Sequence, residues 1–139
     1  MRICVDLDGV VCHLREPGQE YADLEPIPGA AETLRSLRAE GHVIILFTAR
    51  HMKTCEGNVG KVIARQGLTT LQWLEDHDIE YDELHFGKPH ADVYLDDNAM
   101  RFVTWDAIAG DGSSFPTSHE KSDAARRSTE TVAPSDPEP

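Results

Sequence analysis

The sequence predicts an α/β fold with a mainly parallel sheet, because short apolar runs alternate with segments of helical spacing. The runs 2–7 and 42–47 are rich in Val, Ile and Leu and are too short to be buried helices. Each run leads into polar residues, as expected where parallel strands open onto a ligand site. The alternation therefore predicts a sheet covered by helices, with its site beyond the carboxyl ends of the strands.

The first crossover is predicted to contain an irregular loop and then a helix. Residues 10–27 are rich in Pro, Gly and Glu and have no periodic pattern, which indicates a loop or very small flap rather than a folded cap domain. Helical spacing begins at Ala30, continues through Leu34 and Leu37, and stops at Gly41. This helix would return the chain to the sheet.

The second crossover is predicted to contain a polar loop over 49–60 and then a helix. Thr69 or Thr70 can cap this helix, which carries Leu71 and Leu74 on one face. The loop would display its polar groups beside the end of the second strand, where it would border a substrate.

Two further short strands are predicted over 84–86 and 93–95, with Gly87-Lys88-Pro89 between them. After Gly110 the chain consists mainly of Ser, Thr, Asp, Glu, Pro and Ala, which cannot bury enough apolar surface to offset the entropy of ordering. We therefore expect one domain over 1–109 and a disordered tail over 110–139.

The composition limits the partners and the compartment. A chain of 139 residues with 40% apolar residues suits one domain, and a net charge of −12 disfavours non-specific binding to nucleic acid or anionic membranes. No apolar run approaches membrane-spanning length. The three cysteines form no Cys-x-x-Cys pair and follow no apolar leader, so a reduced, cytoplasmic setting is expected.

Two carboxylates follow the first predicted strand. Asp6 and Asp8 are two residues apart, so both point to the same side if strand geometry continues, and Gly9 then allows a sharp turn. Two close carboxylates suit cation binding or separate protonation roles. Taken alone, the pattern Asp-x-Asp-Gly also makes ordinary turns.

The other predicted strand ends carry complementary groups. Thr48 ends the second strand, Lys88 lies between the later strands, and Asp96 and Asp97 follow 93–95. A nucleophilic carboxylate, a hydroxyl, a lysine and further carboxylates would thus meet at one edge of the sheet. Phosphoryl transfer needs such a set, because it requires a metal, fixed donors for the phosphoryl oxygens and a positioned nucleophile.

These four segments, in order, resemble the four motifs of haloacid dehalogenase-like phosphatases, and the spacing is most similar to the short, minimally capped capsule-biosynthesis group. The matching segments are Asp6-Leu7-Asp8-Gly9-Val10, Phe47-Thr48-Ala49-Arg50, Gly87-Lys88-Pro89 and Tyr94-Leu95-Asp96-Asp97. The resemblance covers about residues 1–105. It implies a Rossmann-like, three-layer α/β/α fold with a minimal cap or none.

The resemblance also implies a role for each motif residue. Asp6 would attack phosphorus and form an aspartyl-phosphate, while Asp8 would protonate the leaving oxygen and later take a proton from water. Thr48 and Lys88 would hold the phosphoryl oxygens. The residues implied to hold Mg²⁺ are Asp6, Asp8 through its backbone carbonyl, Asp96 and Asp97. The sequence leaves open whether Asp96 or Asp97 binds the ion directly.

The substrate beyond the phosphate is less defined by the sequence. Candidates for contacts with it follow the first two motifs: Gly9, Ala49, Arg50, Lys53 and Asn58. The closest resemblance implies a sugar phosphate, while nucleotides and 3′-phosphorylated polynucleotide ends stay open. Without a cap the site would be open unless another subunit covers it, so a homo-oligomer is also possible.

Two non-enzymatic interpretations compete with hydrolysis. A signalling receiver module also combines aspartates, Thr and Lys around Mg²⁺, but it has an adjacent acidic pair at its first strand, whereas the adjacent pair here, Asp96-Asp97, comes last. A non-catalytic phosphate-binding relative would be favoured by loss of Asp6 or Asp8, and both are present. Hydrolysis is also preferred over phosphomutase chemistry, because the short 10–27 segment offers little to shield an aspartyl-phosphate from water.

Overall fold

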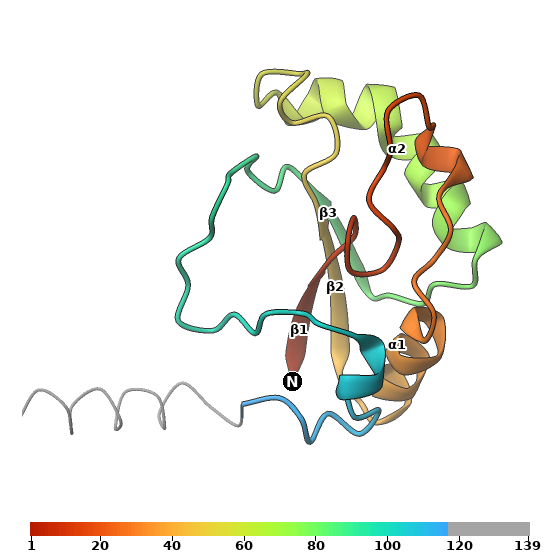
Figure 1. The fold of residues 1–139 in the computed structure, drawn as a ribbon, viewed down its shortest axis with the longest axis vertical. Coiled ribbons are helices and arrows are strands. Elements are labelled where there is room, and N and C mark those ends of the chain that lie inside the picture. The colour runs from red at the N-terminus through yellow and green to blue at the C-terminus, as the bar shows by residue number, and fades with distance from the viewer. Residues whose placement is uncertain (117–139) are drawn as a thin grey trace, which may run out of the picture.

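The structure is a computed structural model in which residues 1–116 are described, so most of the predicted tail lies outside the described residues. Three strands form one parallel sheet in the order β1-β2-β3, and they span Arg2–Asp6, Val43–Thr48 and Glu83–Phe86 (Figure 1). The register pairs Asp6 with Phe47 and Thr48 with Phe86, so the strands end at a common edge. The predicted α/β, Rossmann-like class with a parallel sheet is thus confirmed.

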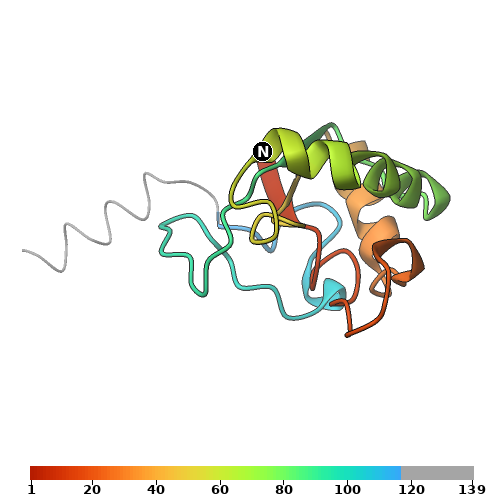
Figure 2. The ribbon, with the colours of Figure 1, turned by 90° about the horizontal axis from the view of Figure 1, so that it is seen from above.

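Two α-helices connect the strands. Helix α1 spans Ala30–Ala39 and helix α2 spans Val59–Asp76, and both lie on the same side of the sheet (Figures 1 and 2). Right-handed crossovers that advance in one direction across a sheet place successive helices on one face. In the described part of the chain, the sheet therefore carries one layer of α-helices, where the sequence predicted a layer on each face.

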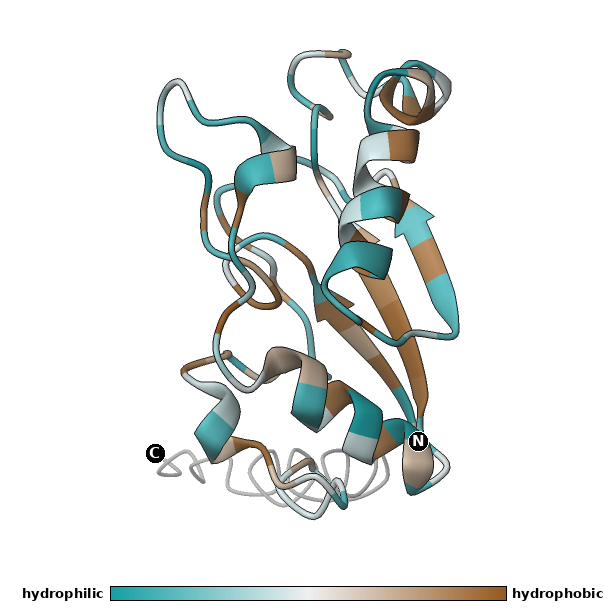
Figure 3. Cartoon of the chain, turned by 90° about the vertical axis from the view of Figure 1, so that its right-hand side faces the viewer, coloured by the Kyte–Doolittle hydropathy of each residue, from teal (hydrophilic) through white to brown (hydrophobic). Residues whose placement is uncertain are grey.

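The burial of β2 follows from this arrangement. Its alternate residues Ile44, Leu46 and Thr48 are fully buried, whereas the residues between them are only half-buried. Strands β1 and β2 are drawn mainly in brown in Figure 3, and in β1 only Val5 is buried. The degree of burial thus alternates with a period of two along β2, although residues on both of its faces are apolar.

Helix α1 was predicted correctly, and helix α2 was not. The buried residues of α1 include Ala30, Leu34 and Leu37, as its spacing indicated. Helix α2 begins ten residues before the predicted cap, because the side chain of Asn58 accepts a hydrogen bond from the Lys61 amide and caps it there. Leu71 is 46% exposed and does not share the buried face of Leu74.

The flap over 10–27 is a loop with one short 3₁₀ helix, η1, at Tyr21–Asp23. Two buried tryptophans hold its ends. The indole of Trp73 donates to the Leu24 carbonyl over 2.7 Å, and the indole of Trp105, at the start of the 3₁₀ helix η2 (Trp105–Ala107), donates to the Val10 carbonyl over 2.7 Å. Both tryptophans thus pack the core and fix the loop.

The predicted strand over 93–95 is absent from the structure. This segment lies in a long loop that leaves the sheet after β3 (Figure 1), and Leu95 is 97% exposed. Among the described residues, β1 pairs only with β2, so its outer edge has no strand beside it. The prediction failed because an apolar run becomes a strand only when a neighbouring strand accepts its hydrogen bonds.

Residues beyond the predicted domain boundary at 109 contact the rest of the domain. Phe115 packs against the core, and the His42 ring bonds the Asp111 carbonyl over 3.1 Å. The domain therefore extends to residue 115 at least. No helix within residues 1–116 combines the length and apolar character needed to cross a membrane.

Candidate active site

The turn after β1 presents two carboxylates at the common edge of the strands. The Leu7 carbonyl accepts hydrogen bonds from the amides of Val11 (2.9 Å) and Cys12 (3.0 Å), which closes the turn tightly. Gly9 has a φ of 86°, a left-handed conformation that costs glycine little and strains other residues. Asp6 and Asp8 thereby flank the buried Leu7 in the chain, one residue before it and one after it.

Lys88 contacts the first of these carboxylates. Its Nζ lies 2.7 Å from Asp6 Oδ2, and the two side chains are 16% and 33% exposed. The Lys88 amide donates to the Thr48 carbonyl over 3.1 Å, which ties the loop after β3 to the end of β2. The preceding Gly87 passes so close to α2 that a Cβ there would lie 2.8 Å from Val59 Cγ2. These two backbone contacts hold the loop after β3 in a position from which Lys88 reaches Asp6.

Arg50 contacts the second carboxylate. Its Nε lies 3.0 Å from both Asp8 oxygens, and its Nη2 lies 2.9 Å from Oδ1. The Arg50 side chain has no exposed surface, whereas that of Asp8 is 21% exposed. Arg50 was predicted to contact the substrate, and the structure places it beneath Asp8 instead. A buried guanidinium needs such a partner, because an unpaired charge in the interior is costly.

Thr48 also belongs to the Asp8 side of the site. The residue is fully buried, its hydroxyl lies 3.5 Å from Asp8 Oδ2, and it accepts a hydrogen bond from the Arg50 amide over 3.1 Å. In this arrangement Thr48 supports the Asp8–Arg50 pair and does not itself face solvent. Its predicted contact with phosphoryl oxygens therefore stays a prediction.

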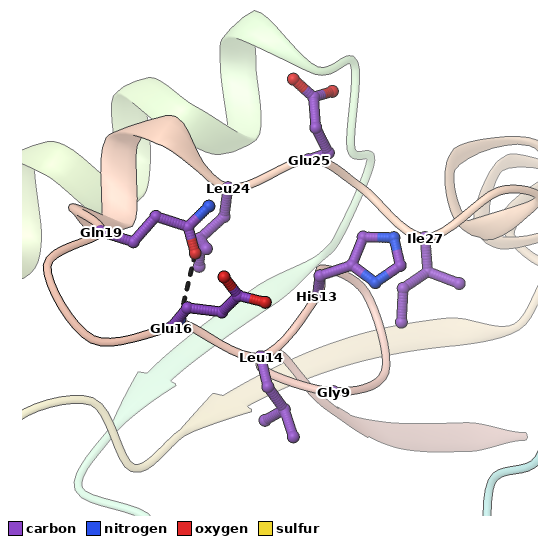
Figure 4. A pocket seen from close by; sticks show the side chains of 8 residues that line it. All are labelled: Gly9, His13, Leu14, Glu16, Gln19, Leu24, Glu25 and Ile27. Carbon is purple, nitrogen blue, oxygen red and sulfur yellow. Dashed lines mark hydrogen bonds between the residues drawn. The ribbon is translucent and has the colours of Figure 1, made fainter.

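One cavity is lined by both carboxylates, and a second begins at the neighbouring Gly9. One, of about 190 Å³, is lined by Asp6, Asp8, Ala49, Lys88, Pro89, His90, Ala91 and Tyr94. The other is an open hollow of about 630 Å³ along the flap (Figure 4), lined by Gly9, His13, Leu14, Glu16, Gln19, Leu24, Glu25 and Ile27. The predicted residues Ala49 and Gly9 each line one of them. The smaller cavity brings a possible nucleophile, a second carboxylate and a lysine together.

Other predicted residues lie elsewhere. Lys53 is exposed, and Asn58 is occupied as the cap of α2. Asp96 and Asp97 are exposed on the loop after β3, where Asp96 accepts a hydrogen bond from the Asn98 amide over 2.7 Å. Across residues 1–116, no three His, Cys, Asp or Glu side chains gather closely enough to hold a metal. The four-aspartate set is therefore not assembled in this conformation.

Two residues at the site were not predicted. Tyr21 covers the Arg50 guanidinium, with the Arg50 Cζ 4.4 Å from the ring centroid, and Cys12 Sγ lies 3.4 Å from Asp8 Oδ1. Neither belongs to a spaced pattern of polar residues, since one lies in an irregular loop and the other resembles a core residue.

Cys12 is expected to resist thiol reagents. Burial, and next the nearby Asp8 carboxylate, raise the pKa of the Cys12 thiol to about 12, so very little thiolate exists at pH 8. Titration of the native protein with Ellman's reagent should leave Cys12 unmodified while the half-buried Cys55 reacts. Peptide mapping would identify the modified thiols, and rapid labelling of Cys12 without unfolding would contradict this packing.

A solved structure is similar to this chain. No family model matches the sequence, and no curated protein matches it. The structure is similar to the crystal structure of a target from Vibrio cholerae, with a TM-score of 0.66 and 30% sequence identity. The match covers 92% of this chain and 98% of the other. The chain belongs to the same family as this Vibrio cholerae protein.

Proposed function

We propose that this protein is a Mg²⁺-dependent phosphomonoesterase that forms an aspartyl-phosphate on Asp6. The observation that carries the proposal is the 2.7 Å contact between Lys88 Nζ and Asp6 Oδ2 in a cavity that Asp8 also lines. A carboxylate paired with a lysine at the carboxyl edge of a parallel sheet suits nucleophilic attack on a phosphate, because the lysine can also attract the phosphate oxygens.

The proposed reaction uses the residues of this cavity in two steps. Asp6 attacks phosphorus, so an Asp6–phosphorus bond forms while the bond to the leaving oxygen breaks, and Asp8 supplies a proton to that oxygen. Water then attacks phosphorus and gives its proton to Asp8, which releases inorganic phosphate and restores Asp6. Lys88 stabilises the phosphoryl oxygens in both steps.

Mg²⁺ would reduce the negative charge of the phosphate when bound. The described residues fit this ion only in part, since Asp6 and Asp8 supply carboxylates while Asp96 and Asp97 stand away on the loop after β3. The proton transfers and the nucleophilic attack use only Asp6, Asp8 and Lys88. The proposal includes movement of the segment 93–97 to the outer edge of β1, which would bring the last two aspartates to the site.

Ligand-dependent ordering of this segment is a testable consequence. Amide hydrogen exchange over 93–97 should slow at least about tenfold when Mg²⁺ and a phosphate mimic such as tungstate are added together, because new strand hydrogen bonds would protect those amides. Exchange over the surface helix α1 serves as the internal control and should not change. Equal exchange over 93–97 with and without both ligands would remove the proposed movement.

A sugar phosphate is the substrate class that we propose first. The larger cavity begins at Gly9, beside Asp8, and its lining residues include Glu16 and Glu25. These carboxylates can accept hydrogen bonds from hydroxyl groups and would repel the further phosphates of nucleotides or polynucleotides. A leaving group with several hydroxyls and no second phosphate is therefore favoured.

The deciding experiment is phosphate release from a panel of sugar phosphates, nucleotides and 3′-phosphorylated oligonucleotides, with Mg²⁺ and with EDTA. We expect release that requires Mg²⁺ and is fastest with sugar phosphates. Fastest release from nucleotides or oligonucleotides would reject the substrate class but keep the chemistry. The absence of release from every member of the panel would contradict the phosphatase and favour a receiver-like or binding role.

A further inference from the structure

The Asp8–Arg50 pair is held more firmly than an ordinary ion pair. Both oxygens of Asp8 lie within 3.0 Å of Arg50 nitrogens, and the Arg50 side chain has no exposed surface. Arginine suits such a contact, because its planar guanidinium can hold both oxygens of one carboxylate at once. The pair therefore restricts rotation of the Asp8 carboxylate.

The remaining contacts of the guanidinium come from α2 and from the two ends of the turn and flap that follow β1. Arg50 Nη1 donates to Thr70 Oγ1 of α2 over 3.3 Å, and Nη2 lies 3.4 Å from Cys12 Sγ in the turn after β1. The Arg50 Cζ lies 4.4 Å from the ring centroid of Tyr21 in the flap. Arg50 thus connects Asp8 to α2 and to the flap together.

The Tyr21 ring is itself held in position. Arg15 Cζ lies 4.9 Å from its centroid, and the His51 ring approaches it edge-on with 5.4 Å between centroids. Cation–π contacts gain strength when the cation is removed from water, as Arg50 is here. The flap segment that bears Tyr21 also contributes Glu16, Gln19 and Glu25 to the larger cavity.

From these contacts we propose that Arg50 is a positioning residue that orients the Asp8 carboxylate toward the leaving oxygen. Tyr21 makes this orientation depend on the position of the flap. The inference rests on the proposed phosphatase function. Arg50 is buried, so it acts on the reaction through Asp8 rather than through the substrate. Displacement of Asp8 would weaken proton transfer, which depends on precise placement of the acid.

Leaving-group dependence separates this role from a merely structural one. An alkyl phosphate such as glycerol 2-phosphate needs a proton on its leaving oxygen, whereas p-nitrophenyl phosphate releases a stable anion with little help. The constant kcat/KM reports the steps up to leaving-group departure for both substrates. Arg50→Lys keeps the charge but loses the two-oxygen contact, so it should reduce kcat/KM for the alkyl substrate about 100-fold. The aryl substrate should lose less than about tenfold.

The outcomes distinguish this inference from the proposed function. Selective loss with the alkyl substrate supports the positioning role. Equal loss with both substrates, or no loss, would overturn it while the phosphatase stands. If the wild-type protein hydrolyses neither substrate with Mg²⁺, the proposed function and the inference both fall.

A second pair of variants covers the case in which Arg50→Lys does not fold. Tyr21→Leu removes the ring that covers the guanidinium, and Tyr21→Phe retains it and serves as the matched control. Tyr21→Leu should show the same selective loss, about five- to tenfold, whereas Tyr21→Phe should behave like wild type. Uniform kinetics in both Tyr21 variants would remove the coupling to the flap.

Discussion

Asp6→Asn is expected to reduce Mg²⁺-dependent phosphate release by at least about 1,000-fold, because it removes the nucleophile and leaves the size of the side chain unchanged. The amide cannot form an acyl phosphate, and it also loses the 2.7 Å ion pair with Lys88. The measurement is phosphate release under saturating substrate, together with mass spectrometry of rapidly quenched protein. Only the wild-type protein should carry a phosphate on the peptide that contains Asp6.

Asp76→Asn is the matched control for this substitution. Asp76 lies at the end of α2 and accepts a hydrogen bond from Gln72, so the same change is made on an exposed surface. This control should retain wild-type activity. Undiminished hydrolysis by Asp6→Asn would instead rule out the covalent intermediate on Asp6.

Trp73→Ala should have the largest effect on stability, with a loss of about 3–5 kcal/mol in the free energy of unfolding. Trp73 is 2% exposed and joins the core to the flap through the hydrogen bond of its indole to Leu24. Small domains have only about 5–15 kcal/mol in total, so the variant should approach the folding limit. Equilibrium denaturation in urea would measure the change.

Two further variants show which part of Trp73 matters. Trp73→Phe keeps most of the apolar ring and removes the donor, so the Leu24 carbonyl loses its partner and we expect an intermediate loss. Leu68→Ala is the control, because Leu68 lies on the same helix and is 82% exposed. It should change the free energy of unfolding by less than about 0.5 kcal/mol. A Trp73→Ala protein as stable as Leu68→Ala would show that this packing is wrong.

Local pattern was sufficient for much of the sheet and for part of the site. Strands β1 and β2 follow from apolar runs that a strand alone explains. All three parallel strands end at one edge of the sheet, and this brings Asp6 at the end of β1 close to Lys88 after β3. Helix α1 follows equally from Leu34 and Leu37, since its buried face is apolar. In these elements, local preference and the tertiary environment agree.

Helix α2 shows where local pattern fails. Its buried positions include Gln66, Gly67 and Thr70, which interrupt the apolar periodicity from which a helix is usually inferred. Thr70 is buried because its hydroxyl accepts a hydrogen bond from Arg50, a residue twenty positions away. Only the packed structure explains why a polar residue occupies the inner face.

The sequence by itself determined the parallel α/β architecture, the paired aspartates after β1 and the lysine after β3. The tertiary structure decided that Arg50 turns inward to Asp8 beneath Tyr21, and that the segment bearing Asp96 and Asp97 stays apart from the other aspartates. The physical reason is that strand ends follow from backbone periodicity, which is local. The direction of a loop side chain depends on which charge and which ring lie beside it, and distant parts of the chain supply both.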